Sequence, residues 1–199
     1  EICDDPMPID DGMKWGFGWE LGPFEMWDAL GFRKVAERMQ AEGLELPAWV
    51  GTMLERDAPG FYRLEHGRLS VWNPDAGDYR ELPEDPGRLN LVHLKTAKRE
   101  VKHNAGASLV DLGDGVACLE FHSKMNSIGG DIIALVGKSI EEVDRNFDGL
   151  VIGNQGDHFS AGANLMMILL EAQEQNWEDL DLMIRAFQRA TMSVKYARK

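Results

Sequence analysis

The sequence predicts a small helical region, then a connector with a β-hairpin, then an α/β domain. Short segments bounded by Gly and Pro fill the first third, and strand patterns around a Gly turn follow residue 59. After residue 106, β-branched runs and amphipathic helices alternate. Such alternation is typical of a parallel α/β arrangement. We therefore expect three segments, 1–58, 59–105 and 106–199.

The first segment is expected to hold short antiparallel helices. Pro23 suits the first position of one helix and Gly31 its end, because Pro has no N–H to leave unpaired and Gly tolerates the turn that stops a helix. Residues 32–40 predict a second helix, and Pro47 opens a third over 48–55. Aromatic and apolar side chains are expected to form their core: Trp15, Phe17, Trp19, Phe24, Trp27, Phe32, Val35, Met39 and Trp49.

The middle segment changes in composition. Residues 61–64 and 69–72 flank the sequence EHGR, which predicts a β-hairpin with a Gly turn. Residues 73–88 are rich in Pro, Gly and Asp, the composition of a connector. Residues 95–103 (KTAKREVKH) form the one basic cluster of the chain, and we expect a solvated surface there.

The last segment begins with a second hairpin. Residues 108–112 and 116–121 lie on either side of Gly-Asp-Gly at 113–115. Apolar residues spaced by three and four predict a helix over 131–145. Residues 148–153 are a short apolar run of the kind found in a sheet buried on both faces.

Two further helices are expected, beginning at Asn164 and at Trp177. Asn176 suits the N-cap of the second, whose apolar residues lie on one face. Those residues are Leu180, Met183, Ile184, Phe187 and Val194.

Composition excludes several classes of function. The chain has 199 residues and a formal charge of −13, which disfavours broad binding to nucleic acid or acidic membranes. Its longest apolar run, residues 165–170, is far below the ~20 residues of a membrane span. Cys3 and Cys118 suggest no disulfide framework, and we expect a cytoplasmic protein. Neither an HExxH motif nor a close Cys pair indicates a metal site. The chain starts at Glu1 and ends without a helix stop signal, so we expect a piece of a longer protein.

The stretch GNQGDHFSAGANL, residues 153–165, is the strongest candidate site. It joins a buried-type strand to an apolar helix through small residues, which let a ligand approach the backbone closely. The first N–H groups of a helix have no partner within it and lie at its positive end, so they can stabilise an anion or a developing oxyanion. Gly162 and Ala163 are placed to offer such donors. The alternative is that these small residues serve only tight packing.

FSAGANL, residues 159–165, resembles the FxAGAD segment of the crotonase superfamily, the enoyl-CoA hydratases and isomerases. The hairpin before it and HSKMNS, from His122, fit the same family. The resemblance covers roughly 106–199 and implies the N-terminal half of the crotonase-like α/β spiral fold. It implies that the amide of Ala163 is half of an oxyanion hole for an acyl-CoA thioester, with Gly162 giving the backbone room. It also implies that Ala161, Lys124 and Asn126 line the CoA site.

The sequence departs from the family pattern in two ways. Asn164 stands where Asp is commoner, which keeps a helix-capping side chain. The family's second oxyanion amide and its catalytic glutamates belong to a part of that fold beyond position 199. Glu171, Glu174 and Glu178 are expected to be solvated, so they offer no pair for acid–base chemistry. His158 and Lys95 could contact CoA, the alternatives being a plain loop histidine and a solvated lysine.

Residues 9–31, IDDGMKWGFGWELGPFEMWDALG, are similar to the C-terminal helical region of 3-hydroxyacyl-CoA dehydrogenases. The shared pattern is ID..M..GFG...GPFE..D..G, and the similarity continues more faintly to Glu55. In that family these helices support dimerisation and the acyl-CoA cleft, while NAD and the catalytic His/Glu pair belong to an earlier domain. No GxGxxG motif follows a strand in this chain.

Together the two resemblances match bifunctional β-oxidation enzymes, with the dehydrogenase first and the hydratase second. We therefore expect a fragment of a multifunctional fatty acid oxidation enzyme, with acyl-CoA as substrate and NAD as cofactor of the parent's dehydrogenase domain. The fragment is expected to be inactive alone and to form homo-oligomers through exposed apolar faces. The alternative is a non-catalytic acyl-CoA-binding or protein-interaction module of crotonase fold. A further alternative is another crotonase chemistry, such as isomerisation or thioester hydrolysis.

Overall fold

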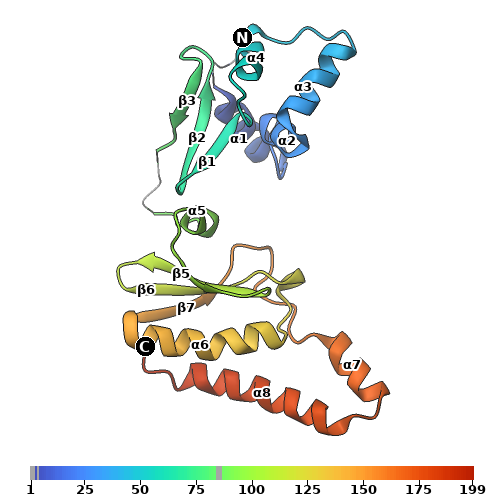
Figure 1. The fold of residues 1–199 in the computed structure, drawn as a ribbon, viewed down its shortest axis with the longest axis vertical. Helices are drawn as coiled ribbons and strands as arrows, with labels where there is room; N and C mark the ends of the chain where they lie inside the picture. Colours follow the sequence, from blue (N-terminus) through green and yellow to red (C-terminus); the bar gives the residue numbers. More distant parts are fainter. Residues whose placement is uncertain (1–2, 4, 84–86) are drawn as a thin grey trace. The chain divides into compact units, whose positions relative to one another are not determined.

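The structure is a computed structural model that describes residues 3, 5–83 and 87–199 (Figure 1). Contacts divide the chain into two units, Glu1–Arg88 and Leu89–Lys199. The expected connector, 59–105, is therefore shared between them, its first strands in one unit and its last residues in the other. No helix of the described residues is long and apolar enough to cross a membrane.

The first unit combines four short helices with a three-stranded antiparallel sheet. The helices are α1 (Pro6–Phe17), α2 (Pro23–Leu30), α3 (Phe32–Ala41) and α4 (Ala48–Glu55). The strands β1 (Tyr62–Glu65), β2 (Arg68–Asn73) and β3 (Asp78–Glu81) pair in that order. The Pro and Gly signals correctly predict α2 and α4, and the first hairpin closes with Glu65 opposite Arg68. Strand β3 lies where the sequence predicted only a connector.

The core of the first unit is an aromatic cluster centred on Phe61, which is fully buried just before β1. The rings of Phe24, Trp27, Phe32 and Trp49 stand edge-on to it, with centroids 4.8–5.7 Å away. Edge-to-face contact suits aromatic quadrupoles and adds about 0.5–1.5 kcal/mol per pair beyond the burial of area. The residue just before β1, in the segment assigned to the connector, therefore supplies the central ring of the helical core.

Several aromatic residues expected in this core lie outside it. Trp15 and Phe17 are 82% and 74% exposed, and Trp19 is also exposed. The reason is that α1 buries residues only near its start, so its last turn and the loop after it extend beyond the core. Val35 and Met39 are half-buried and do not belong to the central cluster.

A buried aspartate of α1 caps the next helix. Asp10 is fully buried and accepts hydrogen bonds from the N–H groups of Phe24 (2.8 Å) and Glu25 (3.1 Å), in the first turn of α2. The hydroxyl of Tyr62 donates a third bond to it at 2.7 Å. An N-cap side chain normally serves these two amides, but the residue before α2 is Gly22. A Cβ on Gly22 would lie 2.3 Å from the Cβ of Asp10, so the aspartate takes the place of a side chain there.

A second aspartate joins α2 to the sheet in the same way. Asp28 accepts from the N–H groups of Phe61 and Tyr62, both at 2.9 Å, and a Cβ on Gly60 would meet its carboxylate at 2.5 Å. Asp10 and Asp28 therefore join α1, α2 and the first sheet through backbone amides.

The pKa of Asp28 makes the stability of the first unit depend on pH. Burial raises this pKa from 3.8 to about 6, against the lowering effect of its two backbone hydrogen bonds. The folded unit thus binds a proton more tightly than the unfolded chain, so this contribution to stability is complete below about pH 4 and is lost as pH rises through about 6.

We expect the difference in free energy of unfolding between Asp28→Asn and the parent chain to shift in favour of the variant as pH rises from 4 to 7. The parent loses stability when Asp28 ionises, whereas the amide of the variant cannot ionise. Urea unfolding followed by tryptophan fluorescence at each pH measures this difference. Asp75→Asn, at an exposed position, controls for the loss of one negative charge. A difference that stays constant or falls with pH would contradict the raised pKa.

The second unit is a four-stranded sheet with helices on both faces. Its strands are β4 (Glu100–His103), β5 (Ala107–Gly113), β6 (Val116–Phe121) and β7 (Gly149–Gly153), in the order β4-β5-β6-β7. The first three pair antiparallel, and β7 pairs parallel to β6. The helices are α5 (Leu91–Thr96), α6 (Gly130–Asn146), α7 (Leu165–Gln173) and α8 (Trp177–Lys195).

Helix α6 covers one face of this sheet, and α8 lies along the far side of α6 (Figure 1). The core between α6 and the sheet contains Leu109, Leu119, Ile132 and Val143, each at most 1% exposed. Helix α5 covers the opposite face, where Leu91 packs with Val110 and Cys118. Burial in this second cluster raises the pKa of the Cys118 thiol, which keeps it protonated and unreactive.

Two expectations for this unit are corrected. Residues 95–103 include the end of α5 and strand β4, so they belong to the fold and are not a linker; none of them is buried, in agreement with the solvated surface expected there. Strand β7 is an edge strand among the described residues, and Val151 is 48% exposed, so it is not buried on both faces.

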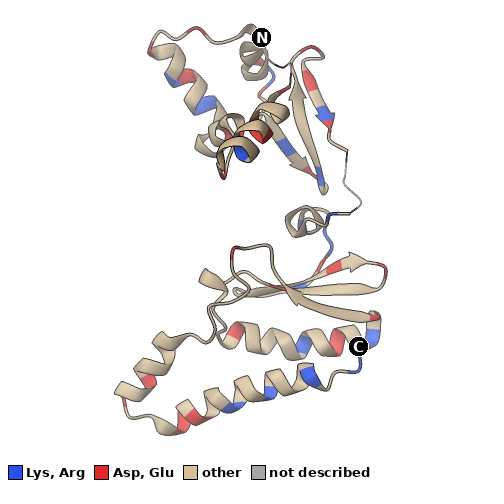
Figure 2. Ribbon diagram, turned by 180° about the vertical axis from the view of Figure 1, so that it is seen from behind, with Lys and Arg blue, Asp and Glu red and all other residues tan. Residues whose placement is uncertain are grey.

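Figure 2 shows few charges on α7, in keeping with its one acidic and no basic residue.

Candidate functional site

The candidate site lies where the parallel strands β6 and β7 end. The loop after β6 forms a short 3₁₀ turn, Lys124–Asn126, before α6 begins. The loop after β7 covers residues 154–164 and leads into α7. The carboxyl ends of neighbouring parallel strands are where α/β sheets bind ligands, because the loops that follow the strands converge there.

Hydrogen bonds join these two loops. The side chain of Asn126 donates to the carbonyl of His158 at 2.8 Å, and the Ser160 hydroxyl donates to the carbonyl of Asn126 at 2.7 Å. The N–H of Ala161 donates to the carbonyl of Met125 at 3.1 Å. The loop after β7 is therefore fixed to the loop after β6 by hydrogen bonds.

A short parallel bridge between Ile128 and Ala163 completes the connection. Ile128 donates to the carbonyl of Gly162 at 2.8 Å and accepts from the N–H of Asn164 at 3.3 Å. In a parallel pair the bonds of one residue go to the two neighbours of its partner, so the partner's own N–H and C=O take no part. Ala163 is that partner.

The amide of Ala163 is consequently unpaired. The N–H groups on either side are occupied: Gly162 donates to the Ser160 hydroxyl at 2.9 Å, and Asn164 donates to Ile128. Within the described part of the chain, no hydrogen bond satisfies the Ala163 N–H. An unpaired amide that is only half-buried is available to a ligand oxygen.

Ala163 is among the residues that line an apolar cavity of about 530 Å³. Ala163 and Asn164 line it at the start of α7, and Gly129 and Gly130 line it at the start of α6. The rest of the lining comes mostly from apolar side chains of α6, α7 and α8: Ile133, Ala134, Met167, Ile168, Met183, Ile184, Ala186 and Phe187. The volume is within the range of ligand pockets, about 300–1,000 Å³.

Two helix N-termini meet at this cavity. Asn164 caps α7 by accepting from the N–H of Met166 at 3.2 Å, whereas Gly129 provides no capping side chain for α6. Each helix start carries a partial positive charge that favours negative charge nearby. The cavity therefore combines apolar walls with a rim suited to a polarised oxygen. Neither Asp, Glu nor His is among its lining residues, so it offers no acid or base.

The predicted site residues have different roles in the structure. Gly162 has φ +88°, a conformation that favours glycine, but a Cβ there would meet nothing within 4 Å. It therefore provides the backbone turn, and the expectation that it gives a ligand room stays a prediction. Ala161 is exposed with its N–H already bonded, and the N–H of Asn126's side chain is used between the loops. Lys124 is exposed, with no ion pair in the described residues. The CoA contacts of these three residues remain predictions.

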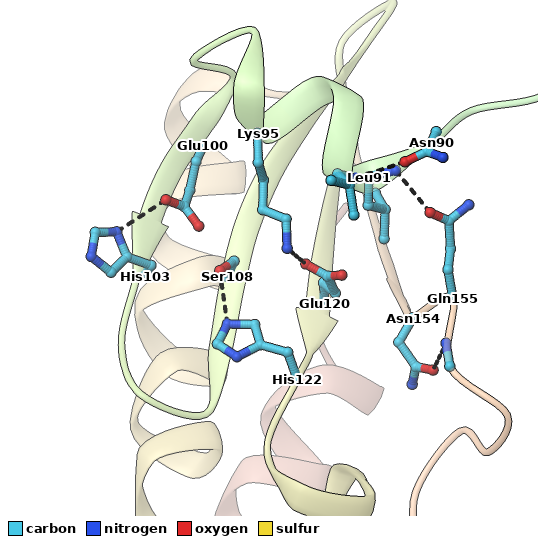
Figure 3. Close-up of polar contacts among 12 residues, drawn as sticks. Asn90, Leu91, Lys95, Glu100, His103, Ser108, Glu120, His122, Asn154 and Gln155 are labelled. Carbon is cyan, nitrogen blue, oxygen red and sulfur yellow. Dashed lines mark hydrogen bonds and ion pairs between the residues drawn. The ribbon is translucent and has the colours of Figure 1, made fainter. Parts of the chain in front are cut away.

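Lys95, considered for CoA phosphates, is engaged within the fold. Its ammonium lies 2.7 Å from the carboxylate of Glu120, which is 7% exposed (Figure 3). Ser108 and His122 lie beside this pair, with Oγ and Nε2 2.9 Å apart. Ser108 is only 2% exposed, so it cannot reach a substrate as a nucleophile.

The sequence reasoning did not find the polar residues that shape the second loop. Asn154 accepts from the N–H of Gly156 and donates to the carbonyl of Phe159, spanning the loop with one side chain. Gln155 is bonded to the backbone before and within α5. The sequence did contain a signal for this role: Asn154 and Gln155 precede Gly156, and an amide side chain beside a glycine favours a local turn.

Comparison with known proteins places this geometry in context. No protein-family model matches the chain. The chain is similar over its full length to "Probable 3-hydroxyacyl-CoA dehydrogenase" of Bacillus subtilis. The identity is 51% over 199 residues, which are 100% of this chain and 25% of that protein. "Putative fatty acid oxidation complex trifunctional enzyme" of Rickettsia felis is 22% identical over 98% of this chain and 24% of its own length.

The chain spans about a quarter of the length of these relatives. Among solved structures, the ECH2 decarboxylase domain of CurF from Lyngbya majuscula shares 20% identity, covering 36% of this chain and 31% of that one, with a TM-score of 0.31. Relatives named for 3-hydroxyacyl-CoA dehydrogenation and fatty acid oxidation thus match nearly the whole chain.

Proposed function

We propose that this chain is the junction segment of a multifunctional fatty acid β-oxidation enzyme. Its first unit would be the C-terminal helical part of a 3-hydroxyacyl-CoA dehydrogenase, and its second unit the first half of a crotonase-like enoyl-CoA hydratase domain. The similarity to a quarter of a relative named as a 3-hydroxyacyl-CoA dehydrogenase supports this proposal. So does the unpaired amide of Ala163, a residue that lines an apolar cavity.

In this proposal the second unit binds the acyl end of an acyl-CoA. The unpaired N–H of Ala163 donates to the thioester oxygen, where negative charge grows as the neighbouring carbons react. The apolar walls of the cavity take the acyl chain, since each buried CH₂ group contributes about 0.8 kcal/mol. The exposed ammonium of Lys124 is available to a CoA phosphate near the entrance.

The cavity of this chain binds and polarises but holds no group that could add or remove a proton. Hydration would need a carboxylate pair from another part of the parent protein. NAD-dependent oxidation of the product would need the His/Glu pair and the NAD site of the parent's dehydrogenase domain. The described residues contain no Gly-rich strand-to-helix turn of the dinucleotide-binding kind, so NAD would not be held by this chain. In the proposal the parent enzyme is cytoplasmic. The exposed apolar side chains of α7 support self-association of the chain.

A non-catalytic acyl-CoA-binding module is the second candidate. The absence of acidic and basic side chains from the cavity lining favours it for the chain by itself. The two candidates predict different parent proteins. A hydratase would bring a carboxylate from elsewhere in its chain to the cavity, whereas a binding module would not.

Calorimetric titration of the chain with acyl-CoA thioesters tests the proposal. We expect affinity to rise by about tenfold or more from a four-carbon to a ten-carbon acyl chain, because the added CH₂ groups enter the apolar cavity. Ala134→Phe, which fills the cavity from α6, is expected to remove that gain. Ala105→Phe, at an exposed position of the same unit, is the matched control.

Replacing Ala163 by lactic acid changes its amide to an ester and removes only the N–H. We expect the ¹³C resonance of a bound thioester carbonyl to move toward its value in free acyl-CoA, since the donor is lost. Free CoA binding as tightly as the ten-carbon thioester, or Ala134→Phe retaining the gain with chain length, would contradict the proposal.

A further inference from the structure

The loop that carries Ala163 is attached to a helix on the opposite face of the sheet from α6. Gln155, two residues after β7, uses both polar atoms of its side chain for this attachment. Its Oε1 accepts from the N–H of Leu91 at 2.8 Å, and its Nε2 donates to the carbonyl of Leu89 at 2.7 Å (Figure 3). One glutamine thus connects backbone groups 64 and 66 residues away in sequence.

Helix α5 is itself firmly held on the sheet. Leu91 is 5% exposed and packs with Val110 and Cys118, and the ammonium of Lys95 pairs with the buried carboxylate of Glu120. Asn90 accepts from the N–H groups of Val92 and His93 but not from that of Leu91. Gln155 therefore satisfies an amide at the start of α5 that the helix cap leaves open.

The remaining contacts of the loop lie farther along the chain. Gly156, Asp157 and His158 are exposed, and the next contacts with other segments are those to Asn126 and Ile128. Without Gln155, residues 154–157 would keep, within the described part of the chain, only the bonds of the Asn154 side chain within the loop, to Gly156 and Phe159. Gly156, next to Gln155, would then let the backbone move, because glycine has the widest conformational freedom.

We propose that Gln155 is a positioning residue, through which α5 holds the loop that presents the Ala163 amide. Leu89 and Leu91 lie where the chain enters the second unit, so this contact makes the entry segment part of the support for the candidate site. The consequence for a ligand rests on the proposed function, whereas the consequence for the loop does not.

Hydrogen–deuterium exchange of the chain tests the loop directly. In Gln155→Met, of similar length but without hydrogen bonds, we expect the hydrogen-bonded amides of Gly156, Ala161 and Gly162 to exchange about tenfold faster, since two neutral hydrogen bonds that hold the loop are lost. The amides of β5 and β6 are expected to keep their rates. Gln40→Met is the matched control, because Gln40 is exposed in the first unit with no side-chain hydrogen bond among the described residues.

Gln155→Glu provides a conservative rescue, because its carboxylate still accepts from Leu91 but cannot donate to Leu89. We expect its exchange rates to lie between those of the parent chain and Gln155→Met. Should Gln155→Met not fold, the acidic variant alone still decides, since a positioning role requires faster exchange confined to the loop. Unchanged loop exchange, or faster exchange throughout the unit, would overturn the proposal.

A ligand readout separates this inference from the proposed function. With a ¹³C-labelled thioester bound, Gln155→Met should move the carbonyl resonance toward its free value, whereas Ala134→Phe should weaken binding of long acyl chains. If no variant and not even the parent chain binds acyl-CoA, the proposed function fails while the exchange result still stands. If Gln155→Met binds the thioester as the parent chain does and its carbonyl resonance does not move, Gln155 does not position the amide.

Discussion

Gly22→Ala is expected to lower the free energy of unfolding of the first unit by about 4 kcal/mol or more, a large part of the total stability of an ordinary domain. The added Cβ would lie 2.3 Å from the Cβ and 2.4 Å from the Cα of Asp10. Backbone atoms cannot rotate away as a side chain can, so α1 and α2 must separate. Their separation breaks the bonds from Phe24 and Glu25 to the carboxylate and leaves it buried without them.

Gly12→Ala is the matched control for this substitution. Gly12 lies within α1, and a Cβ there would meet nothing within 4 Å. Because alanine is the better helix former, this variant should gain about 0.5–1 kcal/mol. Urea unfolding followed by the fluorescence of Trp27, Trp49 and Trp72 reports on the first unit. Equal stability of the two variants would show that Asp10 does not occupy the place of the missing side chain.

Lys95→Met is expected to destabilise the second unit by about 3 kcal/mol, the lower end of the range for breaking a buried ion pair. Glu120 is 7% exposed, so its carboxylate would remain buried without its cation. Lys95 keeps about a quarter of its side chain in contact with water, which moderates the effect. Hydrogen exchange of the β5 and β6 amides measures the change.

The double variant Lys95→Met with Glu120→Gln should recover much of this loss, because neither buried group is then charged. Arg185→Met is the control, since Arg185 and Asp181 on α8 are both more than half exposed and such surface pairs contribute little to stability. A loss as small as that of Arg185→Met would mean that Glu120 is hydrated in solution. A double variant no more stable than Lys95→Met would instead assign the loss to packing of the lysine stem.

Local signals predicted many elements of this fold. Pro23 and Gly31 bound α2, Pro47 precedes α4, and the Gly-Asp-Gly turn joins β5 to β6. These features depend on the conformational preferences of neighbouring residues, which a sequence displays directly. The same reasoning failed for Trp15 and Phe17, because hydrophobicity alone does not say where a helix extends beyond its core.

The candidate site was predicted in part. The sequence pointed to Ala163 as the donor, and the structure leaves its N–H unpaired next to an apolar cavity. It did not reveal why this amide rather than that of Gly162 is free. The reason is the bridge to Ile128, a residue of a different loop, together with the Ser160 hydroxyl that occupies Gly162.

What the sequence determined by itself is therefore the position of most helices and hairpins, and the small residues of the loop before α7. Tertiary structure decided that Asp10 caps a helix other than its own, that Phe61 centres the first core and that Gln155 binds the start of α5. Propensities and turns act between residues a few positions apart. These other contacts join groups 14 to 66 residues apart, and only the packed chain shows which buried polar group satisfies which partner.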